Sequence, residues 1–79
     1  MKLNDNNTEV IIFIEDEMNF EGFLEKIFSA NLTDDVFEKR IFEYVDLLIT
    51  EVAKTLHIDF EEAKELYDEY LTRNILDVI

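Results

Sequence analysis

The chain has 79 residues, enough for one domain with a single core and too few for two, so we expect one domain over residues 1–79. Its 48% hydrophobic content, with seven Phe and three Tyr, predicts a chain that folds, and the absence of Cys excludes disulfides, thiolate metal sites and thiol catalysis. Twenty acidic residues against seven basic ones give a formal net charge of −13, which disfavours direct binding to nucleic acid or to an anionic membrane surface.

The first predicted element is a strand from Thr8 to Ile14, preceded by residues 1–7, which we expect to be flexible. Residues 10–14, with the sequence VIIFI, form a continuous run of β-branched and aromatic side chains typical of a buried strand. A single strand leaves its backbone groups unpaired and therefore needs a partner. We expect that partner to be the tail, residues 75–79, or the same strand of a second copy in a homodimer.

Residues 18–29 are predicted to form the first helix, with Asn19 or Asp16 as its N-cap. Apolar side chains recur at the i, i+3, i+4, i+7 spacing of a buried helical stripe: Phe20, Phe23, Leu24, Ile27 and Phe28. Asn31 is suited to the chain reversal that follows.

The second predicted helix begins after Thr33 as N-cap and ends near Leu56, with Asp34 and Asp35 in its first turn, where the helix dipole favours acids. We expect it to be the central helix, because its apolar face is wide. That face comprises Phe37, Ile41, Tyr44, Val45, Leu48, Ile49, Val52 and Leu56, with Phe42 and Ala53 widening it.

The third predicted helix covers residues 59–72 and begins with a capping box between Asp59 and Glu62. Apolar side chains occupy one side, and acids share the opposite arc: Glu61, Glu62, Glu65, Asp68 and Glu69. Residues 73–79 fit either a strand or a helix. The predicted fold class is therefore α+β, mainly α, with one N-terminal strand and a three-helix unit; an all-α fold is the alternative.

The reactive side chains argue against an enzyme. Ser29 and His57 are the only Ser and His, and no nucleophile pair or Gly-rich phosphate loop can be assembled. The carboxylates lie on predicted polar faces, where nothing desolvates one of them for acid catalysis. The acidic clusters at residues 15–17 and 33–35 lack the spacing and Gly of a calcium loop. We expect no catalytic residue, no metal and no cofactor.

Residues 52–66 resemble a helix-turn-helix unit. A small residue precedes the turn, apolar residues bracket it, and apolar residues line the inner face of the second helix: Ala53, Leu56, Ile58, Ala63 and Leu66. His57 stands where the family usually has Gly, and a plain αα-corner explains the pattern equally well. The outward face is acidic where a DNA reader needs Arg, Lys, Gln or Asn, so we expect no DNA binding by this face.

Two acidic rows form the candidate binding surface. The first contains Glu17, Glu21 and Glu25 at i, i+4 and i+8, and the second is the acidic arc of residues 61–69. Carboxylates four residues apart on a helix are separated by about 6 Å, comparable to two rises of ~3.4 Å along one DNA strand. Such a row can replace backbone phosphates against Lys and Arg. Only Lys26 and Lys64 lie close enough to offset the charge.

In size, charge and lack of catalytic groups, the chain resembles small acidic inhibitors of phages and other mobile elements, among them anti-CRISPR and anti-restriction proteins. The resemblance implies an inhibitor of a basic, nucleic-acid-binding partner such as a CRISPR or restriction nuclease, without a cofactor. The lack of Cys and of a signal-peptide core fits the cytoplasm, which is the host cytoplasm for a phage-encoded protein.

The alternative is a structural or assembly subunit in which the acids serve only solubility. Its binding surface would be aromatic and apolar, since such residues are favoured anchors at interfaces. The candidates are Phe42, Tyr44, Tyr67, Tyr70 and residues 10–14.

Overall fold

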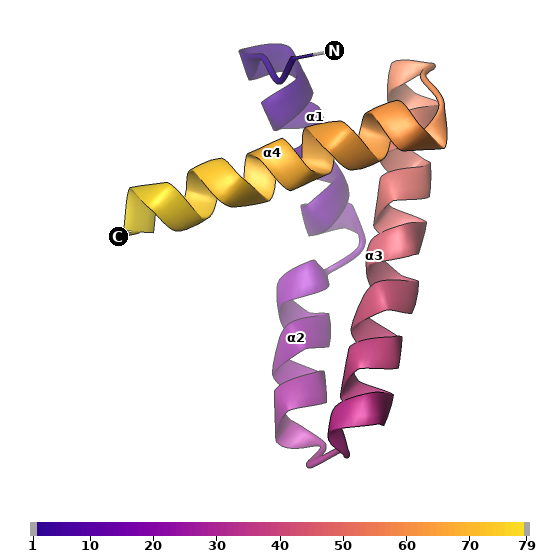
Figure 1. The fold of residues 1–79 in the computed structure, drawn as a ribbon, viewed down its shortest axis with the longest axis vertical. Helices are drawn as coiled ribbons and strands as arrows, with labels where there is room; N and C mark the ends of the chain where they lie inside the picture. The colour runs from indigo at the N-terminus through magenta and orange to yellow at the C-terminus, as the bar shows by residue number, and fades with distance from the viewer. Residues whose placement is uncertain (1, 79) are drawn as a thin grey trace.

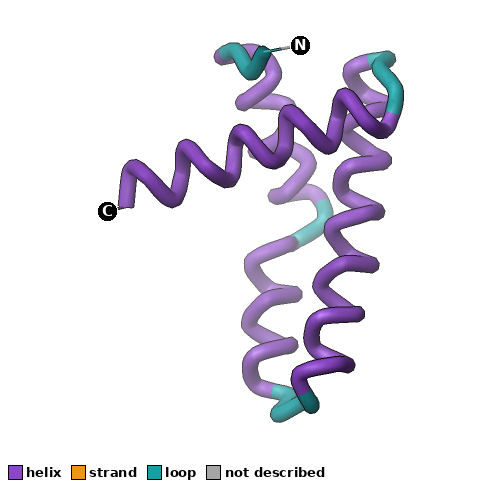
Figure 2. The backbone as a smooth tube through the Cα atoms, viewed as in Figure 1, coloured by secondary structure: helices purple, strands orange, loops and turns teal. Residues whose placement is uncertain are grey.

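The computed structural model describes the backbone of residues 2–78 and the side chains of residues 2–73. It contains four helices: α1 (Asp5–Glu17), α2 (Phe20–Ser29), α3 (Asp34–Leu56) and α4 (Phe60–Val78). Helices α1 and α2 follow one another along the antiparallel α3, and α4 crosses α1 and α3 (Figure 1). No strand is present between residues 2 and 78 (Figure 2). The domain is all-α, so the predicted α+β class is wrong and its all-α alternative is correct.

The predicted strand from Thr8 to Ile14 lies inside α1. The helix begins because Asn4 caps it: the Asn4 side-chain oxygen accepts a hydrogen bond from the Asn7 backbone N–H at 2.8 Å. Asn7, Ile11 and Ile14 then fall on one face of α1 at i, i+4 and i+7 and are buried, and Leu3, which precedes the helix, is buried in the same core. A homodimer through a strand edge loses its basis, and so does pairing with the tail, because α4 continues through Val78.

Two residues, Met18 and Asn19, separate α1 from α2. Asn19 adopts left-handed backbone torsions, φ 54° and ψ 50°, and is the N-cap of α2, although its side chain makes no capping hydrogen bond. Its backbone carbonyl accepts from Phe23 N–H at 3.0 Å. The Asn19 side chain lies over Gly22, where an added Cβ would overlap it. A larger residue at position 22 would therefore require the Asn19 side chain to move.

The ends of α3 and the start of α4 follow the sequence prediction. Thr33 is the N-cap of α3, without a side-chain hydrogen bond, and the helix ends at Leu56 because His57 is left-handed, with φ 58°. The Asp59 carboxylate accepts from Glu62 N–H at 2.8 Å, which is half of the predicted capping box. Helix α4 then extends to Val78, six residues past the predicted end at residue 72.

The core lies where α1, α3 and α4 meet. It contains Leu3, Ile11, Ile14, Leu48, Ile49, Val52, Ala53, Ala63, Leu66, Tyr67 and Tyr70. The apolar faces predicted for α2, α3 and α4 are thus largely confirmed. Four of the predicted positions are exposed instead: Phe28 at 70%, Phe42 at 60%, Phe60 at 37% and Leu71 at 36%. Helix α4 crosses only the C-terminal half of α3 (Figure 1).

Candidate functional site

The outward face of α4 carries an exposed acidic row, which we call the α4 row: Glu61, Glu65 and Asp68. These three side chains lie opposite Ala63, Leu66 and Tyr67, which bury the other face of the helix. Among the described side chains, the ion pairs are Lys54 with Glu51 and Arg73 with Glu69, and neither involves the α4 row. None of the three carboxylates forms an ion pair with another described side chain, although Lys64 stands at i+3 from Glu61 and at i−4 from Asp68 on the same helix.

Glu62 and Glu69 differ from the α4 row, because both are half-buried on its flank. The Glu69 carboxylate accepts a hydrogen bond from Leu3 N–H at 3.1 Å and lies 3.0 Å from the Arg73 guanidinium. Glu69 therefore fastens the start of the chain to α4. Of the five acids expected on the arc of residues 61–69, three face outward with free carboxylates and one holds the fold together.

The structure does not place Glu17, Glu21 and Glu25 in one helical row. Glu17 is the last residue of α1, whereas Glu21 and Glu25 belong to α2, beyond the left-handed Asn19. Glu17 lines a groove with Phe13 between α1 and α3, while Glu21 lines a separate depression beside Tyr70. All three carboxylates are exposed, but only Glu21 and Glu25 keep the expected i, i+4 relation.

Sequence reasoning missed the role of Glu15. Its carboxylate accepts two phenol hydrogen bonds, from Tyr67 Oη at 3.0 Å and from Tyr70 Oη at 2.9 Å, so both oxygens are used. Burial and the adjacent Glu15 charge raise the pKa of Tyr67 far above its ordinary value. The cluster joins α1 to α4. Nothing in the acidic run at residues 15–17 distinguishes Glu15, because its partners lie more than fifty positions away.

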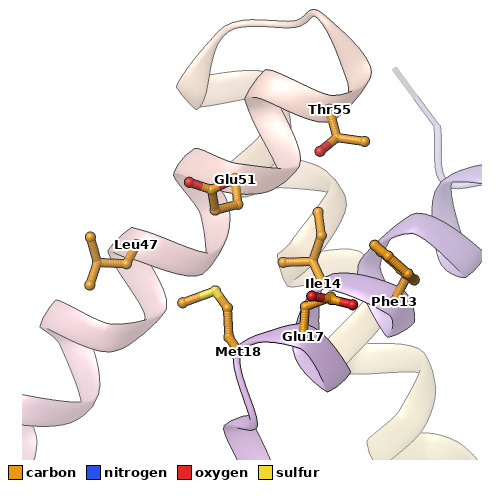
Figure 3. Close-up of a pocket in the computed structure, with 7 residues that line it drawn as sticks. All are labelled: Phe13, Ile14, Glu17, Met18, Leu47, Glu51 and Thr55. Atoms are coloured by element: carbon orange, nitrogen blue, oxygen red, sulfur yellow. The ribbon is translucent and has the colours of Figure 1, made fainter.

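A groove of about 490 Å³ lies between α1 and α3, and we call it the α1–α3 groove (Figure 3). Four apolar residues, two acids and one Thr line it: Phe13, Ile14, Met18, Leu47, Glu17, Glu51 and Thr55. Phe13 is 60% exposed and Leu47 is 59% exposed, so two large apolar side chains border it in contact with solvent. Both residues lie off the buried stripes of their helices, but this pattern alone does not indicate a groove.

The remaining chemistry is sparse. Ser29 ends α2 and His57 follows α3, so these side chains lie at opposite ends of a 23-residue helix, which is roughly 35 Å long. Among residues 2–73, no three His, Asp or Glu side chains come together as a metal site requires. No helix in the described part of the chain has the length and apolar character needed to cross a bilayer. The arrangement offers surfaces for binding.

No protein-family model, curated protein or solved structure matches this chain.

Proposed function

We propose that this chain is a non-enzymatic acidic module that inhibits a nucleic-acid-binding protein, such as a CRISPR or restriction nuclease, by occupying its basic groove. The observation that carries the proposal is the α4 row. Glu61, Glu65 and Asp68 are exposed, lie on one face of a helix and have no ion-pair partner among the described side chains. A helix optimised only for solubility would mix charges of both signs.

The spacing of the row suits a phosphate mimic. Glu61, Glu65 and Asp68 stand at i, i+4 and i+7, so they extend roughly 10 Å along the helix axis, about three rises of a DNA strand at ~3.4 Å each. Ala63 and Leu66 anchor the opposite face of α4 in the core. Because the helix is already ordered, binding would not have to immobilise the backbone that carries these carboxylates.

The net charge supports the same reading. A formal charge of −13 on 79 residues attracts a basic surface over a distance set by ionic strength and accelerates the encounter with it. Glu21 and Glu25, both exposed on α2, add a second short row. Inhibition by this means should weaken as salt screens the charges.

A second candidate function, the assembly subunit, is supported by different residues. Phe13, Phe42 and Leu47 are each about 60% exposed, and Phe13 and Leu47 border the same groove. Exposed apolar side chains that lie together are typical of interaction surfaces. Tyr67 and Tyr70, which were part of the expected aromatic surface, are buried and are excluded from it. In this function the acids only keep the chain soluble, and the affinity for the partner should change little with salt concentration.

The test is to change Glu61, Glu65 and Asp68 together to Gln, Gln and Asn. The matched control changes Glu38, Glu43 and Asp46, which are exposed on α3, in the same way and removes the same charge. The wild-type chain is used to capture its partner from a nuclease-containing lysate, and the affinity of each variant for that partner is measured across a salt series.

We expect the α4 variant to lose at least about tenfold in affinity, equivalent to ~1.4 kcal/mol, with a shallower salt dependence and an unchanged melting transition. The control should lose much less. Equal losses in both variants would mean that only net charge matters, and unchanged affinity would assign the acids to solubility.

A further inference from the structure

The α1–α3 pair is covered on one face and open on the other. Helix α4 lies in front of α1 and α3 in Figure 1 and behind them in the view of Figure 3, which looks into the α1–α3 groove. The groove therefore opens on the face that α4 does not cover. Two packed helices covered on one side leave, on the other, a place for one more helix.

The shape of the groove suits a helix. Leu47, Glu51 and Thr55 form its α3 wall at i, i+4 and i+8, a straight row of about 12 Å along the helix axis. Ile14, which is 5% exposed, and Met18 lie between the walls, while Phe13 borders the α1 side. Covering Phe13 and Leu47 with apolar atoms would remove the largest exposed side chains of this face from water.

The negative charge around the groove favours a positively charged occupant. Glu17 and Glu51 are exposed and line the groove, and only Glu51 has an ion-pair partner, Lys54 at 3.7 Å, among the described residues. A second copy of this chain also has a net charge of −13, so the two copies repel each other at moderate salt. An occupant that carries positive charge beside its apolar face is attracted instead.

We propose that the α1–α3 groove binds an amphipathic, Lys- or Arg-flanked helix of the partner protein, with its apolar side chains between Phe13 and Leu47. Its cations then pair with Glu17 and Glu51. Helix-in-groove binding uses anchors at i, i+3, i+4 and i+7, which a straight wall of this length accepts. The inference rests on the proposed function only in taking the partner to be basic. It assigns a different surface from the α4 row and requires no nucleic-acid binding by the partner.

The probe is a fluorescein-labelled peptide of about 18 residues, roughly five helical turns, with Leu at helical spacing and Lys at the other positions. A peptide of the same composition in scrambled order controls for charge alone. Binding is measured by fluorescence anisotropy at about 150 mM salt, where charge attraction between exposed groups is largely screened beyond ~8 Å. The protein variants are Phe13→Ser, Leu47→Ser and Phe42→Ser. Phe42 is the matched control, because it is as exposed as Phe13 and does not line the groove.

We expect Phe13→Ser and Leu47→Ser each to weaken the ordered peptide by about tenfold, and Phe42→Ser to change its affinity by less than about twofold. The scrambled peptide should bind the wild type more weakly than the ordered one. Circular dichroism checks that each variant folds. If Phe13→Ser does not fold, Leu47→Ser alone still tests the groove.

Three outcomes would overturn the proposal. The first is equal affinity for the ordered and scrambled peptides, and the second is an equal loss in Phe42→Ser. The third is that the wild type sediments as a dimer and Phe13→Ser sediments as a monomer, which would assign the groove to a second copy of the chain. The variant of Glu61, Glu65 and Asp68 should still discriminate the two peptides. Failure of the groove is therefore distinguishable from failure of the α4 row, which is tested by partner capture.

Discussion

The end of the domain that contains α4 combines buried aliphatic side chains with two buried tyrosines, Tyr67 and Tyr70, whereas the end that contains α2 is held together mainly by partly exposed aromatic rings. At the α4 end, Ile11, Leu48, Val52 and Leu66 are completely buried. Helix α2 has a single buried residue, Ile27. Its contact with α3 is a stack of Phe20, Phe23 and Tyr44, in which the Phe23 and Tyr44 ring centroids lie 3.9 Å apart at 10°; the Tyr44 hydroxyl also donates a hydrogen bond to the Met18 carbonyl.

The number of helices at each end explains this difference. Three helices meet at the α4 end and can surround a side chain, but only α2 and α3 meet at the other end (Figure 1), where Ile27 is the one buried residue of α2. Large flat rings can still form extensive contacts there, because they stack on each other across a two-helix interface. Stability should therefore be concentrated where α4 crosses, and substitutions at the two ends should differ in cost.

The largest expected effect is at the α4 end. Leu66→Ala removes a completely buried side chain that α1, α3 and α4 surround, and should lower the free energy of unfolding by about 2–5 kcal/mol. Ile27→Ala, at the two-helix end, should fall at the lower limit of this range because the site can relax towards solvent. Urea denaturation followed by circular dichroism measures both. Equal losses would show that the two ends do not differ in packing.

The next effect concerns the polar link between α1 and α4. Glu15→Gln replaces one acceptor oxygen with an NH₂ donor and removes the charge from the other, so both phenol hydrogen bonds weaken. We expect a loss of about 1–3 kcal/mol in unfolding free energy. Glu17→Gln, with the same charge change at an exposed position nearby, should alter it by less than ~0.5 kcal/mol. If Glu15→Gln also changed the unfolding free energy by less than ~0.5 kcal/mol, the cluster would contribute little to stability.

The smallest effect is a pH dependence at the same cluster. Burial and the Glu15 charge raise the pKa of Tyr67 in the folded chain above its ordinary value of about 10. The corresponding stability is fully present below pH ~10 and is lost as the pH rises above it, by up to ~1.4 kcal/mol per pH unit. Urea denaturation between pH 8 and pH 11 should show a steeper decline for the wild type than for Tyr67→Phe. Parallel declines would contradict the assignment to Tyr67.

The sequence predicted most helix boundaries correctly because caps and stripes are local. The predicted start and end of α3, after Thr33 and at Leu56, and the predicted start of α4 at Asp59 all lie within a residue or two of the observed ends. The strand prediction for residues 10–14 is wrong because β-branched side chains favour a strand locally, whereas Asn7, Ile11 and Ile14 stand at helical spacing. The helical form of residues 10–14 buries Ile11 and Ile14 in the core that α1 shares with α3, and a tertiary contact of this kind cannot be predicted from local composition.

The candidate site was predicted in part. The acids of α4 were expected on an outward face, and Glu61, Glu65 and Asp68 lie there. The row of Glu17, Glu21 and Glu25 failed as a single row because one left-handed residue, Asn19, rotates the chain between them. The α1–α3 groove could not be predicted, since it depends on which face of two helices a third one covers.

All three connections between the helices contain a left-handed residue other than glycine: Asn19, Asn31 and His57. Such torsions cost roughly 1 kcal/mol or more at His57 and less at Asn, whose short polar side chain tolerates them. Glycine would adopt them freely, but it would also give the denatured chain more conformations to lose. This chain, with one Gly and no Pro, therefore carries part of the cost of its three reversals as native backbone strain instead of as conformational entropy lost on folding.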